Sequence, residues 1–296
     1  MQSSASEAFC GNIISKEQLA EIAGIVATFP NLTRAELANT ICELFSWKRP
    51  TGKLKTIECR QFLERLEAKG KIHLPACQQQ YARRTNIKIV WTENSNYREI
   101  LSKKIGELAP VFLAKVNDPS QRLLWYEYVD RYHYLGYRPP FGANLRYFIQ
   151  SGNHPDRLGC LQFSSPAWRM AARDHWIGWN DELRKRNLQK IISNSRFLIF
   201  PWVQVKNLAS KVLGLVVKTV PDDWNECYGY RPALIETLVD KKRFNGTCYR
   251  AANWVHIGKT TGRGRMDRQN KRQGKAIKDI FVYPLSKKFR QTLMQL

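Results

Sequence analysis

Hydrophobic residues recur at helical spacing in three successive segments of the first 75 residues. Apolar side chains return every three or four positions from about Lys16 to Thr28, which predicts a first helix. A second helix is expected to start at Thr33, because Thr33 and Glu36 form a Thr-x-x-Glu capping box. The third predicted helix covers about 56–69, and residues 71–75 are then expected to form a short strand.

A basic turn separates the second and third predicted helices, because residues 47–53 (WKRPTGK) contain a proline and a glycine that interrupt the helical pattern. Three short helices closed by a strand are typical of a winged helix-turn-helix, whose third helix enters the major groove of DNA. The side chains expected to contact DNA there are Lys48, Arg49, Lys53, Lys55 and Arg60. A small helical domain that contacts other proteins is the alternative.

After this predicted DNA-binding domain, residues 1–75, the periodicity weakens over 76–118, and we interpret that stretch as a connector with one helical segment. From 119 to 296 the pattern alternates between helix and strand. We predict a helix at 123–135, a hairpin of strands at 144–150 and 158–164, a helix at 168–190, a strand at 196–205, a helix at 208–220, a strand at 231–240, a short helix at 247–253 and a final strand at 255–259.

This alternation predicts an α/β (α+β) class with a mixed sheet. The order of hairpin, helix, strand, helix, strand, helix and strand resembles the Gcn5-related N-acetyltransferase (GNAT) fold. In that family, glycines in the loop after the central strand cradle the pyrophosphate of acetyl-CoA. The matching residues 205–210 (VKNLAS) contain no glycine, and their side chains would crowd a close approach of phosphate to the backbone. A GNAT-like scaffold is therefore expected, and acyl transfer is the least favoured function.

The net charge of the chain indicates a class of binding partner. The sequence has 48 Lys and Arg against 25 Asp and Glu, a net charge of +23, and such an excess usually faces a polyanion such as nucleic acid. Residues 241–290 alone contain 15 basic and two acidic residues, interleaved with glycines and aromatics. A solvated face or a disordered tail is the alternative. The second set of expected DNA contacts is Lys259, Arg263, Arg265, Arg268, Lys271 and Arg272.

Hydropathy and cysteine spacing indicate where in the cell the protein is expected and whether it has a zinc site. No run of 18 or more apolar residues is present, so no membrane-spanning helix is expected, and the first residues lack the pattern of a secretory signal. The seven cysteines are scattered without a Cys-x-x-Cys pair, so a zinc site is not expected. We therefore expect a cytoplasmic protein with reduced cysteines.

Five segments carry a resemblance to a known family. They are YHYLGY (132–137), RDHWIGW (173–179), NSRFLIFPWVQVKNLAS (194–210), ETLVD (236–240) and GTCYRAANWVHIGKTTGRGR (246–265). Together they resemble the DruA family of the Druantia anti-phage defence system, and they are similar to the front part of some insertion-sequence transposases. The resemblance implies a prokaryotic defence or mobile-element context, with a helicase and other defence proteins as partners.

Two carboxylates are candidates for chemistry. Glu236 and Asp240 lie four residues apart on a predicted strand, so their side chains share one face. Such a pair can hold Mg²⁺ or Mn²⁺ for phosphodiester chemistry, with Asp174 as a third ligand. The alternative is structural: Glu236 paired with Arg250 or Arg231, and Asp240 paired with Lys241 or Lys242 or capping a helix.

Tyr249 and His133 are further candidates. The phenol of Tyr249 can act as a general acid or as a covalent nucleophile on DNA, and His133 can act as a general base. The alternative for both residues is packing in the interior. The sequence as a whole favours a DNA-binding protein of anti-phage defence that recognises DNA, and the alternative is a metal-dependent nuclease or a transposase-like strand transferase.

Overall fold

The structure is a computed structural model that describes residues 7–49, 53–76, 89–140, 142–262 and 277–295. The chain divides into two compact units. The first comprises Met1–Arg83 with the short segments Phe141–Ala143 and Glu226–Tyr230, and the second comprises the rest. Within the described ranges, no helix combines the length and the apolar character needed to cross a membrane.

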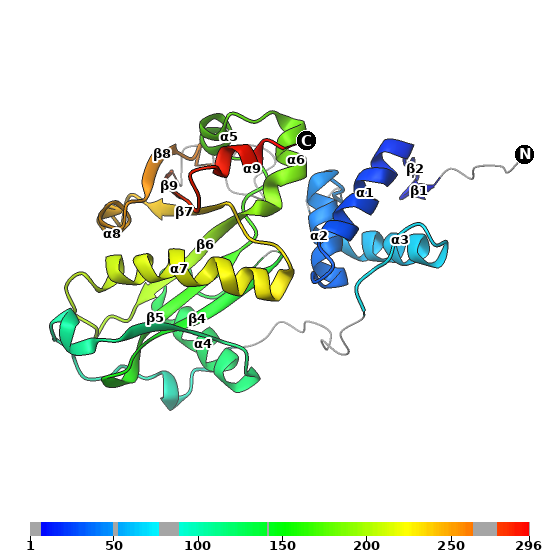
Figure 1. The fold of residues 1–296 in the computed structure, drawn as a ribbon. Coiled ribbons are helices and arrows are strands. Elements are labelled where there is room, and N and C mark those ends of the chain that lie inside the picture. Colours follow the sequence, from blue (N-terminus) through cyan, green and yellow to red (C-terminus); the bar gives the residue numbers. More distant parts are fainter. Residues whose placement is uncertain (1–6, 50–52, 77–88, 141, 263–276, 296) are drawn as a thin grey trace, which may run out of the picture. The chain divides into compact units, whose positions relative to one another are not determined.

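The first unit contains a short hairpin and three helices (Figure 1). The hairpin consists of β1 (Ala8–Phe9) and β2 (Asn12–Ile13), and the helices are α1 (Lys16–Thr28), α2 (Arg34–Leu44) and α3 (Thr56–Ala68). The three predicted helices are thus confirmed. Ser15 and Thr33 close capping boxes at the starts of α1 and α2, which satisfies backbone N–H groups that a helix start leaves free.

The core of this unit is built from the apolar stripes of the helices. Ile22, Leu37, Ile41, Phe62 and Leu66 are fully buried. These positions follow the helical periodicity of the sequence, and burying such side chains is the main favourable contribution to the stability of the unit.

The strand predicted at 71–75 is not present, so the winged-helix arrangement is not confirmed. The backbone N–H of Leu74 donates to the Glu67 carboxylate at 2.9 Å, and Arg34 Nε donates to the Pro75 carbonyl at 2.9 Å. Side chains of α2 and α3 therefore occupy backbone groups that strand pairing would need. Among the described residues of this unit, extended pairing is found in β1–β2 and in a bridge between Lys48 and Leu54.

The second unit is built on a seven-stranded mixed sheet, which confirms the predicted mixed α/β class. All neighbouring strands are antiparallel except the parallel pair β6–β7. In spatial order the strands are β3 (Val111–Lys115), β4 (Asn144–Ser151), β5 (His154–Ser164), β6 (Ile191–Ile199), β7 (Leu234–Asp240), β9 (Lys278–Pro284) and β8 (Val255–Lys259).

Helices cover the sheet, and α7 runs along it in Figure 1. Ile177, Leu188, Leu293 and neighbouring side chains pack against sheet residues such as Leu234 and Ile280 in one buried cluster. The helical segments of the unit are η1 (Glu93–Ser95), η2 (Ile105–Leu108), α4 (Pro119–Tyr132), α5 (Ala171–Ile177), α6 (Asp181–Asn187), η3 (Leu188–Lys190), α7 (Leu208–Tyr228), α8 (Thr247–Ala251) and α9 (Phe289–Leu293).

Four local predictions differ from the structure. The strand expected at 196–205 lies earlier in the chain, at 191–199. The single helix expected at 168–190 is divided, because Gly178 adopts φ 90° after α5 and the Asn180 side chain caps α6. The described part of the predicted connector contributes the edge strand β3. The strand at 255–259 is not the last one, because β9 follows it and inserts between β7 and β8.

A bulge in β6 changes the direction of one side chain. Phe163 pairs with Asn194 and Gln162 pairs with Arg196, so Ser195 is an extra residue on β6. Arg196 therefore faces the side of the sheet opposite to Asn194, although the two are separated by two positions. Just beyond the bulge the pairing of β6 with β7 ends, since it covers only 191–194 with 234–237. We call this region the open end of the β6–β7 pair.

Candidate nucleic-acid interface

The basic residues predicted to contact DNA from the first unit are partly engaged by carboxylates. An Arg49 guanidinium nitrogen lies 2.7 Å from a Glu58 oxygen, and this pair lowers the pKa of Glu58. Arg60 lies 3.6 Å from Glu64 one helical turn away. Lys55 lies over the Phe9 ring at 5.8 Å, while Lys48 pairs through its backbone with Leu54 and Lys53 is exposed.

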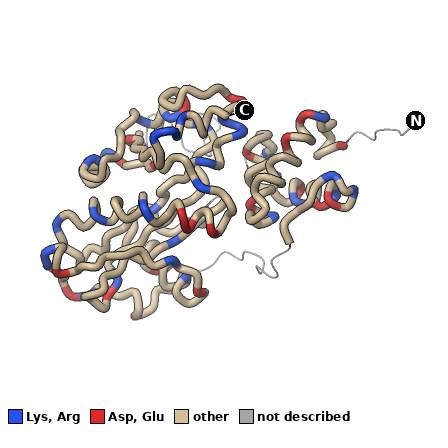
Figure 2. The backbone as a smooth tube through the Cα atoms, in the orientation of Figure 1, with Lys and Arg blue, Asp and Glu red and all other residues tan. Residues whose placement is uncertain are grey.

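The charge balance of the first unit is also close to neutral. Residues 1–76 contain ten Lys or Arg and eight Asp or Glu, so 21 of the 23 net positive charges belong to residues 77–296. Figure 2 shows the backbone positions of Lys and Arg (blue) and of Asp and Glu (red) interspersed along the three helices of the first unit. The attraction for a polyanion that the composition predicts therefore arises mainly from the other part of the chain.

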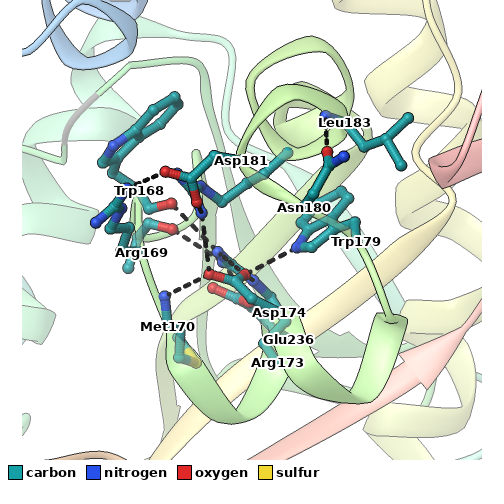
Figure 3. A network of polar contacts seen from close by, with 12 residues as sticks. Trp168, Arg169, Met170, Arg173, Asp174, Trp179, Asn180, Asp181, Leu183 and Glu236 are labelled. Atoms are coloured by element: carbon teal, nitrogen blue, oxygen red, sulfur yellow. Dashed lines mark hydrogen bonds and ion pairs between the residues drawn. The ribbon is translucent and has the colours of Figure 1, made fainter. Parts of the chain in front are cut away.

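Glu236 lies in a buried polar network beneath α5 (Figure 3). Its Oε2 atom lies 3.1 Å from Nη1 of Arg173, a side chain that is also fully buried. Arg173 contacts Asp174 through Nη2 at 2.9 Å and donates to the Ala167 carbonyl at 2.9 Å. The indole N–H of Trp179 donates to Asp174 at 3.1 Å. The structure thus brings Glu236 and Asp174 together, but with a guanidinium between them.

This geometry favours the ion pair over the metal site. Burial raises the pKa of Glu236, and the positive charge of Arg173 opposes that effect. A divalent cation bound to Glu236 would lie close to the fixed charge of Arg173, so these residues do not fit Mg²⁺ or Mn²⁺. Among the described residues, no group of three or more His, Cys, Asp or Glu is arranged to hold a metal ion. The partner of Glu236 is Arg173, not Arg250 or Arg231.

Asp240 does not join that network. It lies four residues further along β7, a separation of about 13 Å along the strand. Its side chain accepts from the backbone N–H of Lys242 at 3.0 Å, and its carbonyl accepts from the N–H groups of Arg243 and Phe244 at 3.0 and 2.9 Å. Asp240 therefore shapes the turn that ends β7. The two carboxylates share one face, as the spacing predicts, but they do not converge.

Tyr249 is placed as a packed residue. Its hydroxyl donates to Oδ1 of Asn194 at 3.1 Å and lies 3.4 Å from Oγ1 of Thr237. Its ring stacks on Phe281 with the centroids 5.6 Å apart. Burial raises the pKa of the phenol, which disfavours the phenolate that a nucleophilic role requires.

Of the second set of predicted DNA contacts, the structure describes Lys259. Lys259 ends the edge strand β8 and is exposed. The other members of this set, Arg263, Arg265, Arg268, Lys271 and Arg272, lie outside the described residues.

The open end of the β6–β7 pair gathers cationic side chains. Arg196 is held by bonds from Nε to the Gly136 carbonyl at 3.2 Å and from Nη1 to the Ser195 carbonyl at 2.7 Å. Burial and the nearby charge of Arg138 lower the pKa of Arg196. Burial also lowers the pKa of Lys278, with Arg196 adding to the effect and Asp240 opposing it. Positive charges are thus crowded here, and a bound anion would relieve their repulsion.

His133 belongs to the same group of side chains. Burial, Arg196 and Lys278 lower the pKa of His133 to about 4. The backbone N–H of Leu135 donates to Nδ1 of His133 at 3.2 Å, which requires an unprotonated Nδ1. His133 is therefore neutral near pH 7. We call Arg196, Lys278, His133 and Asp240 the open-end cluster.

An exposed loop carries more positive charge beside this cluster. Residues 241–244, which we call the basic loop, are Lys241, Lys242, Arg243 and Phe244, and all four are exposed. The Arg243 guanidinium lies over the Tyr134 ring at 5.1 Å, and the rings of Tyr134 and Phe244 meet edge to face at 5.6 Å. Lys241 and Lys242 belong to the basic run 241–290 of the sequence analysis, but as single residues they were considered as partners of Asp240 and not as DNA contacts. A basic, aromatic tetrapeptide directly after a strand was the signal that could have identified the loop.

Comparisons with known proteins identify a family. The family described as Druantia protein DruA matches residues 65–275. No curated protein matches the chain. Similar solved structures include aminoglycoside acetyltransferase AAC(6')-Ib with coenzyme A and kanamycin, which is 15% identical with a TM-score of 0.39 over 62% of this chain and 96% of that one. A putative acetyltransferase from Sphaerobacter thermophilus is 12% identical with a TM-score of 0.32, over 59% of this chain and 93% of that one.

Proposed function

Because the chain belongs to the DruA family, we propose that it binds DNA as a component of a prokaryotic anti-phage defence system. The DNA it holds would be the substrate on which other defence proteins, a helicase among them, act in the cytoplasm. The single observation that carries this proposal is the basic loop beside the open-end cluster, in the part of the chain that holds nearly all of the net positive charge.

The physical basis is neutralisation of phosphate. Lys241, Lys242 and Arg243 are exposed, and Arg196 and Lys278 belong to the adjoining open-end cluster. Binding of DNA to such a group releases condensed counterions, which supplies affinity that does not depend on sequence. Contacts of this kind position DNA, and they explain a basic surface without requiring base readout.

The sheet is proposed to be a GNAT-like scaffold used for this contact. Its elements follow the order hairpin, helices, β6, α7, β7, α8, β8 that the sequence predicts for such a domain. Residues 205–210, directly before and within the start of α7, contain no glycine. Support for DNA binding thus comes from the basic loop, whereas the loop that would hold acetyl-CoA lacks its glycines.

The test is a salt titration with a matched control. We expect Lys241→Glu/Lys242→Glu to weaken binding of fluorescein-labelled DNA, measured by anisotropy, by at least tenfold. The slope of log K against log salt should also fall by roughly 0.7–0.9 for each phosphate that the variant no longer neutralises. Lys103→Glu/Lys104→Glu makes the same charge change at two adjacent exposed lysines that precede η2.

We expect the control double variant to retain binding within about threefold, because it changes only the long-range field. Equal losses in the two double variants, or wild-type binding that does not respond to salt, would contradict the proposal.

A further inference from the structure

We propose that the open end of the β6–β7 pair binds single-stranded DNA in preference to duplex, with Phe244 and Tyr134 as a platform on which bases stack. This inference rests on the proposed function and names the form of DNA that the same site takes. The surface combines the exposed ring of Phe244 and the half-buried ring of Tyr134 with cations, a combination that suits unpaired nucleotides.

Phe244 is an exposed aromatic side chain. Its side chain is 52% exposed in the basic loop, and exposure of a large apolar side chain is typical of a binding surface. Tyr134 supports it by an edge-to-face contact at 5.6 Å, and Tyr134 is itself held between His133, stacked at 4.9 Å, and the guanidinium of Arg243. The platform is therefore supported from behind by packed groups, while Phe244 remains accessible.

The charged groups near this platform are mainly cationic. Lys241 and Lys242 flank the aromatic group in sequence, and the open-end cluster adds Arg196 and Lys278. Asp240 is the acidic member of that cluster, but its carboxylate accepts from the backbone of Lys242 and stands opposite Lys278 across β7–β9. The surface thus offers several cations to phosphates and aromatic rings to bases.

Single-stranded and duplex DNA differ in whether the faces of their bases are free to stack on a side chain. In a duplex, each base already stacks on its neighbours, so an exposed phenylalanine gains little contact there. In a single strand, the faces of the bases are available, and stacking on an aromatic side chain contributes strongly and without regard to sequence. Cations alone would not discriminate the two forms in this way.

The experiment compares two forms of DNA with two phenylalanine variants of the full chain. The probes are a fluorescein-labelled 16-nucleotide oligothymidine and a 16-base-pair duplex, both titrated by anisotropy at a fixed salt concentration. Phe244→Ala removes the proposed stacking group. Phe112→Ala removes an exposed phenylalanine, 42% accessible, from the edge strand β3 and serves as the matched control.

We expect Phe244→Ala to weaken binding of the single strand roughly five- to hundredfold, and binding of the duplex less than twofold. Phe112→Ala should leave both affinities unchanged, and Phe244→Trp should restore or increase affinity for the single strand. In a strand that contains 2-aminopurine, binding to the wild type should quench or shift the fluorescence of the base, and binding to Phe244→Ala should not.

Each failure has its own meaning. Unchanged affinity of Phe244→Ala for the single strand would overturn the stacking platform, and equal losses on both probes would overturn the preference for single strands. In either case, a salt-dependent loss in Lys241→Glu/Lys242→Glu would leave DNA binding intact. If the wild type binds neither probe, the proposed function itself fails, and the stacking platform fails with it.

Discussion

At the scale of single residues, Arg173 is the centre of the buried polar network. It is enclosed by Glu236, Asp174 and the carbonyl of Ala167, so its charge and several of its N–H groups are satisfied inside the unit. An ion pair of this kind does not need to add net stability, since the desolvation of both charges offsets their attraction. Removing one partner is costly, however, because the other is left buried without its counter-charge.

We expect Arg173→Met to lower the free energy of unfolding by about 3–5 kcal/mol, because Glu236 then loses its buried counter-charge. Glu236→Gln should cost less, about 1–2 kcal/mol, since an amide oxygen still accepts from Arg173 and Asp174 still pairs with it. Urea unfolding followed by tryptophan fluorescence measures both values.

Magnesium or manganese provides the control for this interpretation. If Glu236 pairs with Arg173, adding either ion should not change the melting temperature of the wild type more than that of Glu236→Gln. A metal-dependent increase in melting temperature that Glu236→Gln abolishes would show that Glu236 binds the ion, by the linkage between ligand binding and stability.

His133 predicts a pH dependence of stability. An exposed histidine has a pKa of about 6.5, whereas the pKa of His133 is lowered to about 4, so the unfolded chain takes up the proton first as the pH falls. The free energy of unfolding should therefore decrease between pH 6.5 and pH 4, by up to about 3 kcal/mol from this residue.

His133→Asn keeps an acceptor for the N–H of Leu135 and removes the titration. We expect the loss of stability between pH 7 and pH 4.5, measured by urea unfolding at each pH, to be smaller in this variant than in the wild type. Equal losses in the two proteins would contradict a pKa of His133 that is lower in the folded chain than in the unfolded chain.

At the scale of elements, the contact of β5 with β6 depends on Gly159. A Cβ atom at this position would collide with the backbone carbonyl of Leu198 and would lie 3.1 Å from Cα of Ile199. Both are backbone atoms, so they cannot move aside as a flexible side chain can. Gly214, inside α7, has open space at the corresponding position and a φ that other residues adopt.

We expect Gly159→Ala to lower the free energy of unfolding by more than about 2 kcal/mol, because the strands must separate to admit the methyl group. Gly214→Ala should raise it by about 0.5–1 kcal/mol, since alanine loses less conformational entropy in a helix. Thermal unfolding of both variants checks the pair, and a mild effect at Gly159 would contradict the close approach of β5 and β6.

Elements were predictable where one local signal dominates. The helix start at Thr33 follows from its capping box, and the hairpin at 144–164 follows from alternation around a turn. The division of the helix at 168–190 was missed although Gly178 lies in it, because an isolated glycine is tolerated in many helices. The position of β9 between β7 and β8 depends on partners distant in sequence, so no local pattern contains it.

At the scale of the whole molecule, the charge is distributed unequally along the chain. The first 76 residues are nearly neutral, and several of their basic side chains pair with Glu58, Glu64, Glu67 and Glu7. The remaining residues have the large excess. If DNA binding is mainly electrostatic, its affinity should therefore depend more on the second unit than on the first.

We expect Lys48→Glu/Lys53→Glu to weaken DNA binding less than threefold, whereas the same charge change at Lys241 and Lys242 weakens it at least tenfold. Anisotropy titrations at two salt concentrations measure both, and a larger loss in the first double variant would restore the three-helix unit as the principal DNA contact.

Helices, turns and the net charge of +23 follow from local chain chemistry, since capping, periodicity and ionisation depend on residues close in sequence. The partner of Glu236 does not. Arg173 lies 63 positions away and reaches Glu236 only because α5 packs over the sheet. The open-end cluster likewise requires the bulge at Ser195, which turns Arg196 across the sheet, and the pairing of β9, which brings Lys278 opposite Asp240. Strand register and packing decide such contacts, and both are set by pairings between distant segments.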